Sequence, residues 1–347
     1  MPEVTHDQVL AKRLIVHKSF NKTLTALKNT NIRLPSEPSP ASMDYQWINS
    51  GPTDDLVVNL EEMGGYSLNA KAGETVAKDS RTLIAGYDES INKFSALEGT
   101  AYYTSHSLVF LAPESYIPVN QLTMYFFTRS EELSLRSKGA LIYSTQPSIQ
   151  SQKMYLDDKV DFIFSSVPAN SILFIDGPLI AGDVYTHLIS KFPGFHERNI
   201  IPCFFVKNSD SNMVVNNIEN IRGRYNSDLH WGHSTLKNGQ RSCFFKYVDR
   251  KNARNTKVFC YLKAFGISPL RIEFYTTSFD KYSDYINNIM DLIYYLLLVQ
   301  GDLKNPQIRP IAIAESYARE TLKIVNFEQT MRMAGLMPTM NQERFAW

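Results

Sequence analysis

The chain has 347 residues, about twice the usual length of a single domain, so it can form one large domain or two modest ones. Hydrophobic residues make up 44% and charged residues 20%, a composition that excludes disorder over most of the chain. The 36 Lys and Arg residues balance 35 Asp and Glu residues, so binding to a polyanion requires a local patch or an enclosed channel.

Cysteine usage and hydropathy indicate a cytoplasmic protein. Cys203, Cys243 and Cys260 are odd in number and lack CxxC spacing, which argues against a disulfide framework or a zinc knuckle. The first twenty residues lack the apolar region of a secretory signal. Polar residues interrupt the apolar stretch at 286–299, which is also too short for a membrane span. We therefore expect a reducing compartment and no membrane partner.

The N-terminal region differs in pattern from the rest of the chain. Apolar residues at helical spacing over residues 5–27 predict an amphipathic helix, and the proline-rich residues 31–52 predict a long connection. We expect residues 1–55 to supply partner or dimer contacts. Residues 56–330 form the expected main domain, and residues 331–347 form a C-terminal tail.

The middle of the chain alternates between strand and helix patterns. Short apolar runs predict strands at residues 82–87, 96–103, 107–112, 171–175 and 200–206. Apolar stripes predict helices at residues 130–138, 153–167 and 184–192. The order indicates an antiparallel meander continued by βαβ units, hence an α/β fold with a mixed sheet flanked by helices.

The remaining residues predict further strands and a helical extension. Alternating patterns predict strands at residues 244–248, 257–262 and 270–275. Helical patterns follow at residues 282–299 and 311–324. No internal repeat or clean linker divides this region from the preceding sheet.

Two aspartates occupy equivalent positions in the predicted sheet. Asp88 follows the first apolar strand, and Asp176 follows the strand after the helix. Functional side chains gather at the ends of neighbouring strands, because the strands fix their spacing. The alternative interpretation is that each Asp caps a turn, which Asp does well.

A third acidic candidate lies on the predicted helix at residues 153–167. At 100° per residue, Asp158 points nearly opposite the apolar stripe and is expected in solvent, as is Asp161. Asp157 falls at the edge of the buried face, from which it could lean toward Asp88 and Asp176. Converging carboxylates repel one another unless a cation is present, and hard oxygen ligands suit Mg²⁺ or Mn²⁺. Such a cation supports phosphodiester hydrolysis.

The order of these acidic residues along the strands and helix resembles the layout of ribonuclease-H-like nucleases. The amino-acid sequences of the motifs resemble those of the NurA nuclease family. The matching segments are Thr82-Leu-Ile-Ala-Gly-Tyr-Asp-Glu-Ser90, Ala96-Leu-Glu-Gly-Thr-Ala-Tyr-Tyr103, Leu156-Asp157, Ile172-Leu-Phe-Ile-Asp-Gly-Pro-Leu179, Ile200-Ile-Pro-Cys-Phe-Phe-Val-Lys207 and Leu270-Arg-Ile-Glu-Phe274. The resemblance extends from about residue 83 to residue 318, and the Asp-Gly-Pro-Leu segment is its most specific match.

The sequence departs from the family pattern at three places. Glu89 replaces the Gly that follows the first Asp, and Asp157 replaces a Glu. In the last motif the family carries a Tyr and, eight residues later, a His, whereas this chain has Gln307 and Glu315. Glu can ligate a hard cation, but it cannot transfer a proton as imidazole does.

The resemblance implies a metal-dependent DNA nuclease that uses Mn²⁺ or Mg²⁺. Its main metal ligands would be Asp88, Asp157 and Asp176, with Glu315 as an auxiliary ligand. The resemblance also implies a homodimer that acts beside a HerA-type hexameric DNA-translocating ATPase in DNA end processing or defence against foreign DNA. The sequence has no GxxxxGK[ST] phosphate loop, which agrees with a separate ATPase.

Two other functions stay open at this point. One is a catalytically weakened dimeric DNA clamp that regulates the ATPase, which the departures at Gln307 and Glu315 favour. The other is a phosphoesterase acting on nucleotides or RNA, since metal ligands specify phosphate chemistry and not the sugar. His230 and His233 lack a third metal ligand and predict hydrogen-bonding roles, and the basic residues 246–257 predict a solvated loop.

Overall fold

The computed structural model describes residues 56–79, 82–111, 116–137, 140–180, 185–207, 211–249, 252, 254–266, 268–301, 307–336 and 338–339. The predicted helix at residues 5–27 and the predicted connection at residues 31–52 lie outside these residues. Within the described part of the chain, every helix is too short or too polar to cross a membrane.

A mixed sheet organises the described residues. Its main path runs β1-β10-β11-β12-β8-β7-β3-β4-β5-β6, and β9 joins β2 to β11. The strands are β1 (Leu56–Asn59), β2 (Gly65–Ser67), β3 (Leu83–Ser95), β4 (Thr100–Leu111), β5 (Tyr116–Thr128), β6 (Ile142–Tyr143), β7 (Ser171–Asp176), β8 (Ile200–Val206), β9 (Gln240–Ser242), β10 (Phe245–Val248), β11 (Thr256–Lys263) and β12 (Leu270–Tyr275).

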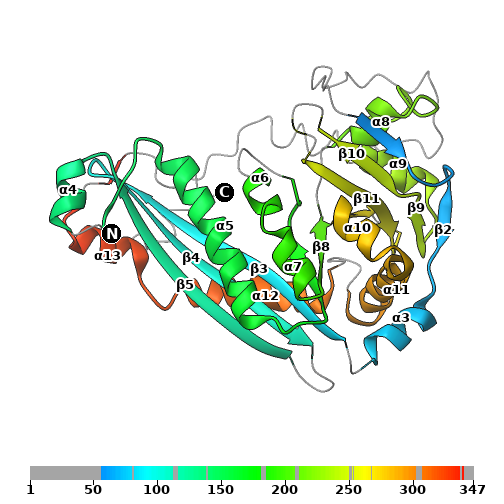
Figure 1. The fold of residues 1–347 in the computed structure, drawn as a ribbon, viewed down its shortest axis with the longest axis horizontal. Coiled ribbons are helices and arrows are strands. Elements are labelled where there is room, and N and C mark those ends of the chain that lie inside the picture. The colour runs from blue at the N-terminus through cyan, green and yellow to red at the C-terminus, as the bar shows by residue number, and fades with distance from the viewer. Residues whose placement is uncertain are drawn as a thin grey trace, which may run out of the picture. The chain divides into compact units, whose positions relative to one another are not determined.

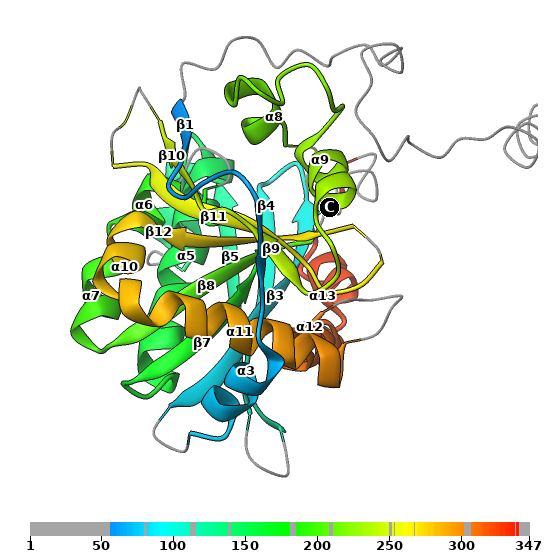
Figure 2. The same cartoon turned by 90° about the vertical axis from the view of Figure 1, so that its right-hand side faces the viewer.

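Helices cover both faces of this sheet. They are α3 (Ala70–Ala77), α4 (Glu131–Arg136), α5 (Pro147–Ser166), α6 (Tyr185–Ile189), α7 (Phe192–Glu197), α8 (Met213–Asn217), α9 (Asp228–Thr235), α10 (Thr276–Lys281), α11 (Ser283–Gln300), α12 (Arg309–Leu322) and α13 (Phe327–Met333). Figure 1 shows α5 in front of β3 and β4 and α12 behind them. Figure 2 shows α3 beside α11. The backbone N–H of Asn69, the N-cap residue of α3, donates a hydrogen bond to Asp291 Oδ1 of α11 at 2.8 Å.

The predicted fold class is confirmed. Strands β3, β4 and β5 form an antiparallel meander, and β7 and β8 continue the sheet in parallel with β3. Helix α4, the short strand β6 and helix α5 lie between β5 and β7 along the chain. The C-terminal helical extension is also present as α12 and α13, and the expected boundary at residue 330 falls inside α13.

The meander strands are longer than predicted. Strand β3 does not end at Tyr87: it pairs with β4 through Ser95, so Asp88-Glu89-Ser90 lies within a strand and not in a turn. The two strands predicted at residues 96–103 and 107–112 are one strand, β4, and the third strand is β5. Continuous backbone pairing accommodates the polar residues that suggested strand ends.

The strand alternation divides the core into two layers. On the α5 face, Ala85 and Tyr87 of β3 pack with Leu156 and Val160 of α5. On the opposite face, the buried side chains of β3, β7 and β8 pack with α11 and with the N-terminal turn of α12, and include Ile84, Ile172, Phe174, Cys203, Phe205, Ile289, Ile293 and Ile311. Because side chains alternate along a strand, the residue number decides which layer each polar side chain faces.

Candidate metal centre

The parallel register of β3 and β7 brings Asp88 and Asp176 together. The last paired positions are Tyr87 and Ile175, so the two aspartates are the next residue on each strand. Both follow the alternation of Ile84, Ile172 and Phe174 and therefore face the α12 layer. After Asp176, Gly177 adopts a φ of +91°, a conformation that favours glycine, and turns the chain away from the sheet.

Helix α12 crosses β3 closely at Gly86. A Cβ atom at Gly86 would lie 2.5 Å from the carbonyl carbon of Pro310 and 2.7 Å from the Ile311 nitrogen, so only glycine permits this approach. The close crossing places Glu315, one turn further along α12, beside the two aspartates.

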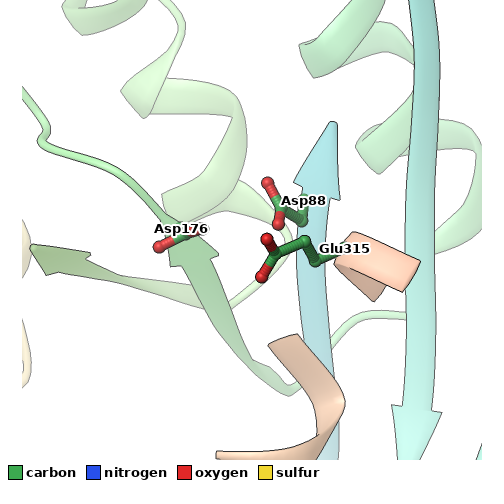
Figure 3. Close-up of side chains that lie close together, drawn as sticks. All are labelled: Asp88, Asp176 and Glu315. Atoms are coloured by element: carbon green, nitrogen blue, oxygen red, sulfur yellow. The ribbon is translucent and has the colours of Figure 1, made fainter. Parts of the chain in front are cut away.

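The structure thus brings Asp88, Asp176 and Glu315 together from three elements. One oxygen of each carboxylate lies within 4.8 Å of the others. Figure 3 shows the three side chains close together on β3, β7 and α12. Three carboxylates at this separation form a donor set suited to a hard divalent cation, so the residues fit Mn²⁺ or Mg²⁺.

The electrostatics at Asp88 are unfavourable in the metal-free protein. The side chain is 7% exposed. Burial, and then the charges of Asp176 and Glu89, raise the pKa of Asp88 to about 8. The Glu89 N–H, which donates to Asp88 Oδ1 at 2.8 Å, and Lys207 oppose this shift only in part. A buried carboxylate with acidic neighbours is a typical position for a cation.

Lys207 is the site residue that sequence reasoning missed. It directly follows β8 and shares the face of Cys203 and Phe205. Its Nζ lies 2.8 Å from Asp176 Oδ2 and 3.4 Å from Glu315 Oε2. The available signal was its position as the first polar residue after a fully buried strand, next to the strand that carries Asp176.

Glu315 has further polar neighbours on its own side. Arg319, one turn along α12, donates to Glu315 Oε1 at 2.5 Å. Gln307 is 5% exposed and places its Nε2 3.5 Å from Glu315 Oε2. Gln307 and Glu315, which both depart from the last motif of the family, therefore contact each other.

Asp157 lies outside this cluster, contrary to the sequence-based expectation. It belongs to α5, which covers the face opposite to that of Asp88 and Asp176. The Asp157 carboxylate is 41% exposed and lies 2.8 Å from both His187 Nε2 and Lys191 Nζ. Burial acts to raise its pKa, but the hydrogen bonds from Lys191 and His187 outweigh burial and lower it.

The edge of α5 that faces β3 carries other side chains. The Tyr155 hydroxyl donates to the Glu89 carboxylate, and Lys159 Nζ lies 3.4 Å from Glu89 Oε2. The Glu89 side chain therefore lies on the face of the sheet that α5 covers and is not part of the Asp88 cluster. Asp158, expected in solvent, instead accepts a hydrogen bond from the Tyr125 hydroxyl at 2.9 Å, whereas Asp161 is exposed as expected.

A cleft of about 330 Å³ opens beside Asp176 on the α5 side. Its walls combine apolar side chains such as Leu156 and Leu188 with the polar groups of Glu89 and Lys159. Asp176 and the two residues that follow it also line the cleft, so the cleft reaches the end of β7.

Neither a protein-family model nor a curated protein matches the chain. Among solved structures, the NurA nuclease from Sulfolobus solfataricus aligns with a TM-score of 0.46 at 10% identity, over 95% of this chain and 98% of that chain. A NurA structure with manganese aligns with a TM-score of 0.30 at 9% identity, over 74% of this chain and 95% of that chain.

A NurA structure bound to dAMP and manganese aligns with a TM-score of 0.29 at 8% identity, over 67% of this chain and 83% of that chain. These proteins bear the name of the family that the sequence motifs resemble.

Proposed function

We propose that this protein is a metal-dependent nuclease that hydrolyses phosphodiester bonds in DNA. The observation that carries the proposal is the convergence of Asp88, Asp176 and Glu315 from β3, β7 and α12. Asp88 and Asp176 stand on paired strands of a buried sheet, which holds their spacing more rigidly than a loop would. DNA is the proposed substrate because of the family resemblance of the motifs around these residues.

A bound Mn²⁺ or Mg²⁺ would polarise a phosphoryl oxygen and lower the pKa of an attacking water. The protein contributes the anionic groups that hold the cation, and their rigid placement orients the substrate phosphate. Lys207 supplies a positive charge beside the same carboxylates, where it can pair with a phosphate oxygen. Glu315 would act as an anionic ligand, and its carboxylate also pairs with Lys207 and Arg319.

The partners belong to the same proposal. A homodimer working with a HerA-type ATPase would supply the enclosed DNA path that a chain of nearly zero net charge requires. Residues 1–55 are the proposed segment for these contacts. A role in DNA end processing or defence against foreign DNA follows from the same resemblance, and the proposed cytoplasmic location rests on the cysteine and hydropathy patterns of the sequence.

The test is cleavage of linear double-stranded DNA by purified protein in Mn²⁺, with EDTA as the metal-free control. Asp88→Asn and Asp176→Asn should each lower the cleavage rate by about 100-fold or more while the fold is retained. Asp161→Asn is the matched control, because this aspartate is exposed on α5. Wild-type cleavage by either site variant would refute the assignment.

A second candidate is the catalytically weakened DNA clamp that regulates the ATPase. The contact between Gln307 and Glu315 favours it, because these residues stand where the family has Tyr and His. A clamp would bind DNA and stimulate the ATPase but leave DNA intact in Mn²⁺, with or without the ATPase. Cleavage under either condition decides for the nuclease.

A further inference from the structure

Lys207 lies beside the three carboxylates that fit a divalent metal ion. Its ammonium group contacts two of the three carboxylates, Asp176 and Glu315, at 2.8 and 3.4 Å. Asp176 and Glu315 each offer one carboxylate oxygen to the cluster in which the ligand atoms lie within 4.8 Å of one another. A divalent cation bound by these oxygens would stand next to a positive charge, which is electrostatically unfavourable.

We propose that Lys207 is a built-in counter-cation that competes with the divalent metal and must be displaced when the metal binds. This inference rests on the proposed metal site and adds a determinant of its affinity. The ammonium group limits the repulsion between Asp176 and Glu315 in the metal-free protein. Its side chain is 28% exposed, so it can move toward solvent without breaking a buried core.

The chain contains a matched lysine away from the site. Lys191 is 33% exposed and pairs with Asp157 at 2.8 Å, nearly the same exposure and distance as in the Lys207 pair with Asp176. Lys191 belongs to the α6–α7 connection on the opposite face of the sheet. Removing its charge perturbs one comparable ion pair without touching the three clustered carboxylates.

The experiment measures Mn²⁺ affinity directly, by electron paramagnetic resonance of free Mn²⁺ in a titration of the full chain. Lys207→Met should lower the Kd for Mn²⁺ by about tenfold or more, which corresponds to about 1.4 kcal/mol. Lys207→Arg keeps the charge and should stay within about threefold of wild type, and Lys191→Met within about twofold. Asp176→Asn identifies the binding site, because it should abolish the titration.

The outcomes separate this inference from the proposed function. An unchanged or weaker Mn²⁺ affinity in Lys207→Met overturns the competition, as does a Lys207→Arg variant that behaves like Lys207→Met. If neither wild type nor Lys207→Met binds Mn²⁺, the proposed metal site and the competition both fail. Binding in Lys207→Met but not in wild type is the strongest form of the expected result. Circular dichroism of each variant confirms that it is folded.

Discussion

Replacing Asp88 with Asn should stabilise the metal-free protein at neutral and alkaline pH. The pKa of Asp88 rises from 3.8 to about 8 because the side chain is buried and because Asp176 and Glu89 add negative charge. Since the folded pKa lies above the unfolded pKa, the contribution of Asp88 to stability is fully present below pH 3.8 and is lost as the pH rises to about 8. Asparagine avoids this loss and can still accept the Glu89 N–H bond.

The size of the effect follows from the pKa difference. One pKa unit corresponds to about 1.4 kcal/mol. At pH 7 the folded protein still holds the Asp88 proton that the unfolded chain has released, which costs up to about 4 kcal/mol of folding free energy. For a chain of this size, 1 kcal/mol shifts Tm by about 2 °C, which gives an increase of up to about 8 °C for Asp88→Asn. At pH 5 the cost is about 1.6 kcal/mol, and the expected increase is about 3 °C.

The assay is thermal unfolding of wild type and Asp88→Asn in EDTA at pH 5, 6, 7 and 8. The difference in Tm between the two proteins should grow steadily with pH. Added Mn²⁺ should then raise the Tm of wild type but not that of the variant, because only the wild-type site binds the cation. A pH-independent difference, or an Asp88→Asn protein less stable than wild type at pH 8, would refute the electrostatic reasoning.

Three further substitutions test the site. Asp157→Asn should leave Mn²⁺-dependent DNA cleavage within about twofold of wild type, because Asp157 lies on the opposite face of the sheet. A loss of cleavage rate as large as that of Asp176→Asn would show that Asp157 belongs to the metal site. Glu315→Gln should raise the Mn²⁺ Kd by about tenfold, measured by titration, whereas equal Kd values would exclude Glu315 as a ligand. Gly86→Ala should lower the free energy of unfolding by about 2 kcal/mol in urea denaturation, because its Cβ would clash with the Pro310 backbone; an unchanged midpoint would contradict the close crossing.

The sequence contains enough information to predict the sheet but not the lengths of its strands. The order of apolar runs predicted the meander followed by parallel strands, because alternation and connection rules act locally. The sequence predicts that this strand ends at Tyr87, because Asp88-Glu89-Ser90 has the composition of a turn, whereas β3 continues to Ser95. Only pairing with β4, a nonlocal interaction, keeps these polar residues in a strand.

The site could be predicted from the sequence only in part. Asp88 and Asp176 follow from strand order, because each is the next residue after the last paired position of β3 and β7. The helical spacing of α5 identifies the residues at the edge of its apolar stripe, but it does not indicate which face of the sheet the helix covers. For this reason the sequence-based prediction placed Asp157 in the metal site. Lys207 was missed because its contact with Asp176 depends on the pairing of β7 with β8.

The most direct test of the central claim is an anomalous difference map from crystals soaked in Mn²⁺ without other divalent ions. The structure predicts a peak within coordination distance of the carboxylate oxygens of Asp88, Asp176 and Glu315, with the Lys207 ammonium displaced from its contacts. Absence of a peak among these three side chains, or a peak at Asp157 instead, would contradict the assignment of the metal centre.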